Sequence, residues 1–225
     1  MSSDVVHTYH GAPDNPTIFV VSGPSGSGKE TAIHYLMAKH GVERVVTLTT
    51  RKLRDGEVSG QQYEFVDNEE FVRRGIAGEL LEHVRTYGSD AYASPASLLS
   101  SENAIAECVL EMDPQGYVEL KEKSDRKVIG VFLVPPTLQT LKDRIIARSS
   151  VPNLDARLHA ATSQFVFSNL YEYRILNDGI NDLHEALDAI IMIERMKSSA
   201  AGAVREMVDE ARRIEYLDLL GDSDG

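Results

Sequence analysis

A short glycine-rich segment, residues 22–31, constrains this chain more than any other feature. The apolar run 18–21 before it predicts a buried strand, and a helical pattern follows it to about His40. A strand, then Gly-x-x-x-x-Gly-Lys, then a helix is typical of a loop that binds phosphate. The glycines let backbone N–H groups approach an anion, and the start of the helix adds partial positive charge. The motif predicts that Lys29 reaches the β- and γ-phosphates of a nucleoside triphosphate.

The residue after this lysine departs from the motif. A Ser or Thr is usual there and its hydroxyl ligates Mg²⁺, but this chain has Glu30, and the nearest hydroxyl belongs to Thr31. A carboxylate at this position could ligate the ion or point away from it. We expect it to point away, because phosphates repel an unneutralised acid and Mg²⁺ tends to keep several waters.

Composition and charge exclude several other classes of protein. The 225 residues give room for one core with a lobe or two, and the net charge of −12 opposes a general nucleic-acid-binding surface. The single cysteine, Cys108, excludes an internal disulfide framework. Because the sequence has no apolar run of membrane-spanning length and no secretory signal, we expect a cytoplasmic protein with neither membrane nor nucleic-acid partners. Its oligomeric state stays open.

The order of the remaining patterns predicts an α/β fold. Further strands are expected at 44–50, 106–112, 128–134 and 173–177, and further helices at 137–148, 154–171 and 181–196. Strands separated by helices predict a parallel sheet flanked by helices on both faces.

The alternation is interrupted between residues 51 and 95, where short strands and turns dominate. The pattern predicts strands at 61–66 and 80–85, with Asn68 capping a helix to about Arg74 between them. We therefore expect a small mixed lobe inserted into the core. The expected parts are a flexible arm at 1–16, a core at 17–50 and 96–196 with a short lid at about 148–157, the lobe at 51–95, and a helical appendage with an acidic tail at 197–225.

Two groups of basic residues suit the binding of phosphates. In the first group, Arg51 and Arg54 flank a turn near Tyr63, and two guanidinium groups with a phenol can hold a phosphate dianion. The alternative is a pair of exposed arginines without a ligand.

The second basic group lies around a short polar break. Arg144 and Arg148 are one helical turn apart, and Arg157 follows the break. They suit a lid that closes positive charge over transferring phosphates. An ordinary charged helix surface is the alternative.

Three acids are candidates for contacts with a substrate or a metal. Glu82 shares a strand face with Leu80 and Val84, so an inward carboxylate needs a donor pair, such as the N1–H and amine of guanine. Glu111 and Asp113 follow a buried strand on one face, where they can orient the water shell of Mg²⁺ or accept bonds from a substrate. For both sets, solvated surface acids are the alternative.

Taken together over about residues 17–196, these features resemble guanylate kinase. The matching pieces, in family order, are 23–29, 49–51, Arg54, Gly56, Glu57, Gly60, Tyr63, Phe65, Val66, Glu82, Gly88, Tyr92, Ser94, Glu111, Asp113, Gln115, Gly116, Pro135, Pro136, Arg144, Arg148, Arg157, Leu158, Asn177 and Asp178. The resemblance implies a P-loop core, a GMP-binding lobe, a lid and ATP-dependent phosphorylation of GMP to GDP.

The resemblance also implies roles for single residues. Those expected to bind ATP are Gly23, Ser25, Gly26, Ser27, Gly28, Lys29, Glu30, Thr31 and, near the adenine, Asn177. Those expected to hold the GMP phosphate are Arg51, Arg54, Tyr63 and Tyr92, and those expected to read the guanine are Thr47, Glu82, Ser94 and Asp113. Those expected to act on the transferring group are Lys29, Arg144, Arg148 and Arg157. Mg²⁺ would accompany ATP, with Glu111 and Asp113 acting through water.

The sequence departs from the family pattern at several positions besides Glu30. Three residues differ from those usual in the family: Glu111 replaces an Asp, Ala93 replaces a Gly and Leu53 replaces a Pro. In addition, the turn at 88–92 is one residue longer, and the segment 148–157 is short for a lid. None of these changes removes a group that the chemistry requires, but together they suit a divergent, slower enzyme.

Two alternatives to a GMP kinase remain. One is a non-catalytic module that holds a phosphorylated partner, as the guanylate-kinase-like domains of scaffold proteins do. Such domains typically have degraded phosphate loops, so the intact Lys29 with Arg144 and Arg148 favours catalysis. The other is a kinase for a different small phosphate ester. A GTPase is disfavoured, because Asn177 and Asp178 do not form the Asn-Lys-x-Asp guanine signature.

Overall fold

The computed structural model describes residues 16–53, 56–81, 84–85, 90–101, 106–148 and 154–221, and of these it gives no side-chain placement for 84–85, 148, 155–157, 160 and 211–221. Internal contacts divide the chain into two units. One unit spans 15–188, and the other combines 1–14 with 189–225.

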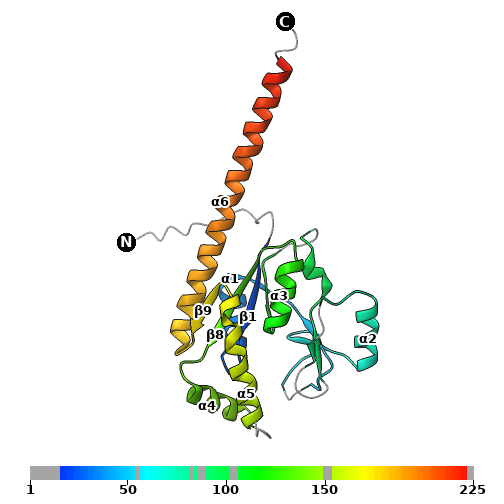
Figure 1. Cartoon of the computed structure of the whole chain (residues 1–225), viewed down its shortest axis with the longest axis vertical. Coiled ribbons are helices and arrows are strands. Elements are labelled where there is room, and N and C mark those ends of the chain that lie inside the picture. The colour runs from blue at the N-terminus through cyan, green and yellow to red at the C-terminus, as the bar shows by residue number, and fades with distance from the viewer. Residues whose placement is uncertain are drawn as a thin grey trace. The chain divides into compact units, whose positions relative to one another are not determined.

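Within the described part of the larger unit, five parallel strands form the main sheet (Figure 1). Their order is β2 (Glu43–Arg44), β7 (Cys108–Glu111), β1 (Ile18–Ser22), β8 (Val128–Val134) and β9 (Tyr173–Leu176). β1 lies at the centre, where Val20 pairs with Leu110 on one side and Gly130 on the other. Every residue of β1 is buried, as expected for a central strand of a sheet covered on both faces.

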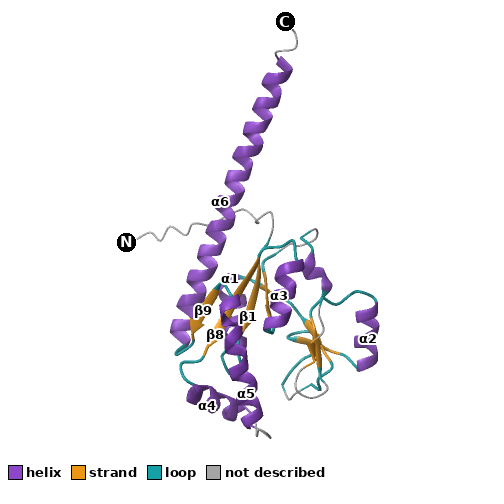
Figure 2. Cartoon of the chain, in the orientation of Figure 1, coloured by secondary structure: helices purple, strands orange, loops and turns teal. Residues whose placement is uncertain are grey.

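Helices connect these strands, as Figure 2 shows. They are α1 (Lys29–His40) after β1, α3 (Pro114–Lys123) after β7, and α4 (Leu138–Arg148) and α5 (Leu154–Gln164) after β8. A further helix, α6 (Ile180–Gly221), follows the last strand, β9. This alternation confirms the predicted α/β class with a parallel sheet.

A second, mixed sheet of four strands is seen in the described residues from Thr47 to Ala93, so it begins before the lobe expected over 51–95. Its order is β4 (Tyr63–Phe65), β3 (Thr47–Thr49), β6 (Ala91–Ala93) and β5 (Val84–Arg85), with β3 parallel to β4 and the other pairs antiparallel. Phe71 of helix α2 (Asn68–Ile76) packs with Leu48, Ala91 and Ala93 in a separate small core. The predicted inserted mixed lobe is therefore present, and it has its own apolar core.

The strand expected over 44–50 is in fact two strands in different sheets. Arg44 pairs with Val109 in the main sheet, whereas Leu48 pairs with Ala93 in the small sheet. Val45 still donates a backbone hydrogen bond to Val109, at 2.9 Å, before the chain leaves the main sheet. An apolar, β-branched run is compatible with either sheet, so its sequence pattern does not reveal the switch.

Two further expectations for the lobe are corrected. Asp67, not Asn68, caps α2, and its carboxylate accepts a backbone hydrogen bond in the first turn at 2.8 Å. The strand expected over 80–85 is a strand at Val84–Arg85, whereas Leu80 forms an isolated bridge with Pro95. Residues 82–83 lie outside the described part of the chain.

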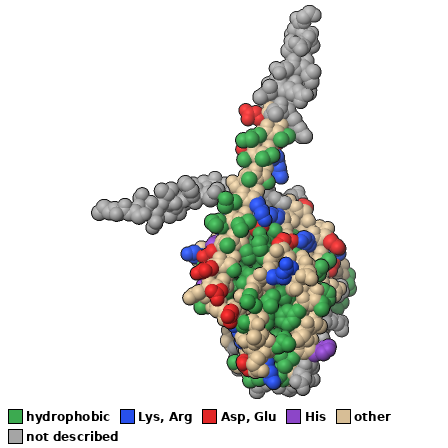
Figure 3. Space-filling view, turned by 60° about the vertical axis from the view of Figure 1, so that its left-hand side comes forward, with side chains coloured by type: hydrophobic (Ala, Val, Ile, Leu, Met, Phe, Trp, Pro, Cys, Tyr) green, Lys and Arg blue, Asp and Glu red, His purple; other side chains and the backbone are tan. Residues whose placement is uncertain are grey.

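The helical predictions also change toward the C-terminus. The helix expected over 154–171 ends at Gln164 and continues as a 3-10 turn, Phe165–Leu170. The helix expected over 181–196 continues without interruption to Gly221. In the smaller unit this helix exposes apolar side chains, with Met192 and Met207 each more than half exposed (Figure 3). Within the described ranges, no helix is both long and apolar enough to cross a membrane.

Candidate active site

The glycine loop after β1 has the backbone geometry that only glycine tolerates. Gly23, Gly26 and Gly28 have positive φ angles of 138°, 88° and 101°. A Cβ on Gly23 would lie 2.6 Å from the Leu133 carbonyl oxygen, and one on Gly28 would lie 2.3 Å from Nδ2 of Asn177. The N-cap residue of α1 is Gly28, which has no side chain to bond the first N–H groups of the helix. The loop therefore follows a tight path into a helix whose first N–H groups can meet an anion.

Lys29 extends back over this loop. Its Nζ donates to the carbonyl oxygens of Gly23 at 2.7 Å and Pro24 at 3.1 Å. The same nitrogen lies 3.3 Å from Oε1 of Glu111, at the end of β7. The structure thus brings together the motif lysine and a predicted strand-end acid at the carboxyl edge of the main sheet.

Asn177 braces the loop from the end of β9. Its Nδ2 donates to the Ser27 carbonyl oxygen at 2.7 Å, and its own carbonyl oxygen accepts from Nη2 of Arg144 at 3.2 Å. Asn177 and Ser27 are both buried. Within the described part of the chain, the buried Ser27 hydroxyl has no hydrogen-bond partner. Burying a hydroxyl without a hydrogen-bond partner is energetically costly, so this hydroxyl is a candidate to hydrogen-bond a polar atom of a bound ligand.

Glu30 forms an ion pair that the sequence did not reveal. Its two carboxylate oxygens accept from Nη1 and Nη2 of Arg44, at 2.8 and 3.0 Å. Nε2 of His34 lies 3.0 Å from Oε1 of the same carboxylate. Glu30 and Arg44 are 14 residues apart, and only the packing of α1 beside β2 brings them together.

A second group of predicted residues gathers on the small sheet. Arg51 is buried and forms a two-pronged pair with Glu57, at 2.9 and 2.8 Å. Its guanidinium carbon lies 5.5 Å from the ring centre of Tyr63 and 5.2 Å from that of Phe65. The ring centre of Tyr92 is 5.9 Å from that of Tyr63. Glu57 matched the family pattern, but no role was predicted for it.

The pKa of Tyr63 responds to charged residues of both the small sheet and the main sheet. Burial raises the pKa of its phenol above the ordinary value, and the negative charge of Glu111 raises it further. The charges of Arg44 and Arg51 lower this pKa, but burial outweighs them. Tyr63 therefore remains a protonated hydrogen-bond donor at neutral pH. Because Glu111 also contacts Lys29, this acid lies near both groups of residues.

The residues predicted to read a base are only partly described. Thr47 and Ser94 are both buried, and the pairing of Leu48 with Ala93 places them opposite each other on neighbouring segments. Asp113 caps α3, since its Oδ1 accepts from two backbone N–H groups at 2.8 and 3.0 Å.

Four predicted site residues cannot be placed by their side chains. Arg54 and Glu82 lie outside the described residues. Arg148 and Arg157 lie on α4 and α5, but their side chains are outside the description. Of the remaining loop residues, Ser25 is exposed at the loop and Thr31 lies in the first turn of α1. In the parts of the chain that are described, no group of three or more His, Cys, Asp or Glu side chains is arranged to hold a metal.

The fold and the loop define the class of protein. A glycine loop at the carboxyl end of a central parallel strand, followed by a helix and crossed by its own lysine, is the site of a P-loop nucleotide-binding protein.

Comparisons with known proteins identify the family. The model of the guanylate kinase family matches residues 15–194. The guanylate kinase of Clostridium perfringens (strain SM101 / Type A) is 37% identical over 211 residues, covering 91% of this chain and 94% of that protein. The guanylate kinase of Anaplasma phagocytophilum (strain HZ) is 31% identical over 202 residues, covering 88% and 96%. The crystal structure of guanylate kinase from A. phagocytophilum gives a TM-score of 0.66 at 28% identity, covering 81% of this chain and 88% of that one. The chain belongs to the guanylate kinase family.

Proposed function

We propose that this member of the guanylate kinase family phosphorylates GMP to GDP with ATP, using the phosphate loop for one substrate and the small sheet for the other. The observation that carries this proposal is the position of Glu111. Its carboxylate pairs with Lys29 of the loop, and its charge acts on Tyr63 of the small sheet. We infer that the residues proposed for the two phosphates act on one transferring group.

ATP is held mainly by backbone N–H groups of the loop and by Lys29. The unpartnered, buried hydroxyl of Ser27 supports this proposal, because an oxygen of the nucleotide would satisfy it. Asn177 contributes as a brace, since its amide fixes the Ser27 carbonyl oxygen and so the shape of the loop. Arg144 donates a hydrogen bond to the main-chain carbonyl oxygen of Asn177, and its positive charge lies beside the loop.

GMP is held by the small sheet. Arg51, Tyr63 and Tyr92 supply a cation and two phenols for its phosphate, and we propose that Arg54, which lies outside the described residues, adds a second cation. We propose that the guanine is read by Thr47, Glu82, Ser94 and Asp113. A carboxylate that accepts from both N1–H and the exocyclic amine would select guanine over adenine, whose N1 carries a lone pair.

Phosphoryl transfer requires positioning and stabilisation of charge, with little covalent chemistry from the protein. Lys29 and Arg144, with Arg148 and Arg157, surround the transferring group. Mg²⁺, when bound with ATP, neutralises phosphate charge. Glu111 and Asp113 fit such an ion as acceptors from its water shell, because Mg²⁺ is bound through one or two carboxylates together with substrate phosphates.

The experiment measures ADP production from MgATP with each nucleoside monophosphate as acceptor. We expect turnover with GMP and at least a hundredfold lower kcat/KM with AMP, the direction that the paired guanine contacts require. The binding-module alternative predicts GMP binding without turnover, and a kinase for another ester predicts no turnover with any nucleotide acceptor. Either result would overturn the proposal.

A further inference from the structure

The acid in the first turn of the phosphate-loop helix is held by a partner from the main sheet. Arg44 presents its guanidinium from β2, where its backbone is fixed by pairing with Val109. Both of its terminal nitrogens bond the Glu30 carboxylate, at 2.8 and 3.0 Å. The Arg44 side chain is only 8% exposed and that of Glu30 is 35% exposed, so the guanidinium is buried while the carboxylate stays partly open to solvent.

The charges explain why this chain needs such a pair. Glu30 directly follows Lys29, so its carboxylate belongs to the same helix start that receives the phosphates. A helix N-terminus by itself favours an acid, but a second anion at that place repels it. A two-pronged guanidinium contact cancels the charge and also fixes the direction of the carboxylate. In this pair the negative charge of Glu30 is compensated and the orientation of its carboxylate is fixed, so that the acid no longer opposes nucleotide binding.

We propose that Arg44 is a positioning residue of the phosphate site, which neutralises Glu30 and holds its carboxylate away from the bound nucleotide and its metal. This inference rests on the proposed function only in taking ATP as the anion. Arg44 does not contact the substrate in this proposal and acts through Glu30.

The test compares Arg44→Met, Glu30→Gln and the double variant. The measured quantity is the dissociation constant of ATP with EDTA present, by calorimetry, alongside the KM values for MgATP and GMP. We expect Arg44→Met to weaken ATP binding at least tenfold, because the Glu30 carboxylate beside the phosphates loses its guanidinium partner and keeps only His34. Adding Glu30→Gln removes that charge and should restore the affinity to within threefold of the wild type. The KM for GMP should change less than threefold throughout.

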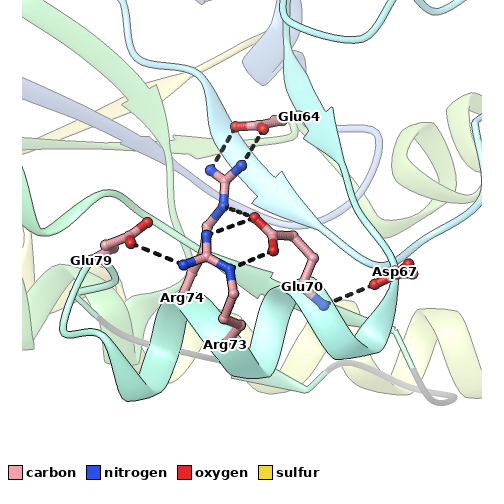
Figure 4. A network of polar contacts seen from close by, with 6 residues as sticks. All are labelled: Glu64, Asp67, Glu70, Arg73, Arg74 and Glu79. Carbon is pink, nitrogen blue, oxygen red and sulfur yellow. Dashed lines mark hydrogen bonds and ion pairs between the residues drawn. The ribbon is translucent and has the colours of Figure 1, made fainter.

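A matched control is available in the lobe. Arg74 also forms a two-pronged pair, with Glu64 at 3.0 and 2.6 Å, and it bonds Glu70 as well (Figure 4). Arg74→Met therefore removes a comparable ion pair outside the phosphate loop. It is expected to lower the melting temperature but to leave the ATP dissociation constant within twofold of the wild type. A purely structural effect of losing an Arg–Glu pair would weaken ATP binding in both arginine variants.

Three results would overturn the role of Arg44. They are an Arg44→Met variant that binds ATP within twofold of the wild type, a double variant that binds as weakly as Arg44→Met, and an Arg74→Met control that loses as much affinity. If Arg44→Met does not fold, the Glu30→Gln variant alone tests the proposal. We expect this variant to bind ATP at least as tightly as the wild type. Tenfold weaker binding would refute the proposal. A wild-type protein that turns over no GMP refutes the proposed function instead, and leaves the ATP-binding comparison valid.

Discussion

The brace between Asn177 and the phosphate loop gives a quantitative prediction. In Asn177→Ala, the buried Ser27 carbonyl oxygen loses the donor that now lies 2.7 Å away, in a place that water does not reach. Leaving a buried acceptor unsatisfied costs about 1–3 kcal/mol. Since the same carbonyl lies in the loop that binds ATP, we expect the KM for ATP to rise, with about 150-fold as the upper bound if the whole cost is met only on ATP binding.

The stability of the protein should fall with the affinity. A loss of 1 kcal/mol lowers Tm by about 2–4 °C in a chain of this size, so the expected decrease is roughly 2–12 °C. Asn177→Asp sharpens the test, because it keeps the volume but places an anionic oxygen against the carbonyl of Ser27. We expect it to bind ATP less well than Asn177→Ala.

The assay combines initial rates at varied ATP and varied GMP with thermal unfolding. The KM for GMP is the internal control and should stay within threefold, because the proposed GMP residues lie on the small sheet. Asn177→Ala with a wild-type KM for ATP and an unchanged Tm would refute the brace. Asn177→Asp that binds ATP better than Asn177→Ala would refute the assignment of Nδ2 as the donor to the loop.

The remaining predictions concern the lysine, the two substrates and one helix cap. Lys29→Ala should lower kcat by about a hundredfold or more with little change in Tm, and an unchanged rate of ADP production would contradict its role. Arg51→Met should raise the KM for GMP at least tenfold while the KM for ATP stays within threefold; the exposed Arg73→Met serves as the control, and an equal effect of both would count against Arg51. Glu82→Gln should lower the ratio of kcat/KM for GMP to that for AMP, and a change under about threefold, well below 1.4 kcal/mol, would show that Glu82 does not read the base. Asp67→Ala should cost about 1 kcal/mol through loss of the α2 cap, seen as a Tm about 2–4 °C lower, whereas an unchanged Tm would rule out that contribution.

The sequence best predicted those features that depend on residues close together along the chain. The strand expected over 128–134 has those bounds in the structure, because its short length, its β-branched residues and the prolines that follow it favour a buried strand over a helix. The glycine spacing identifies the phosphate loop, and the positive φ angles of its glycines explain that spacing. The helix α3 was missed, although Asp113 at its cap and Pro114 at its first position are known signals for a helix start. From the sequence, Asp113 is expected to contact a substrate or a metal, or to be a solvated acid, and not to cap a helix.

Tertiary structure alone decided which residues support the loop. Asn177 and Ser27 are 150 residues apart, and Glu30 and Arg44 are 14 apart on different elements. No local period marks such pairs, since they form only when β9 and β2 take their places beside the loop and its helix. The division of 44–50 between two sheets has the same origin, because strand propensity does not specify a strand's partner. The sequence by itself determined the phosphate loop, the α/β class and the inserted lobe, whereas packing decided how the loop is held and how its unusual acid is neutralised.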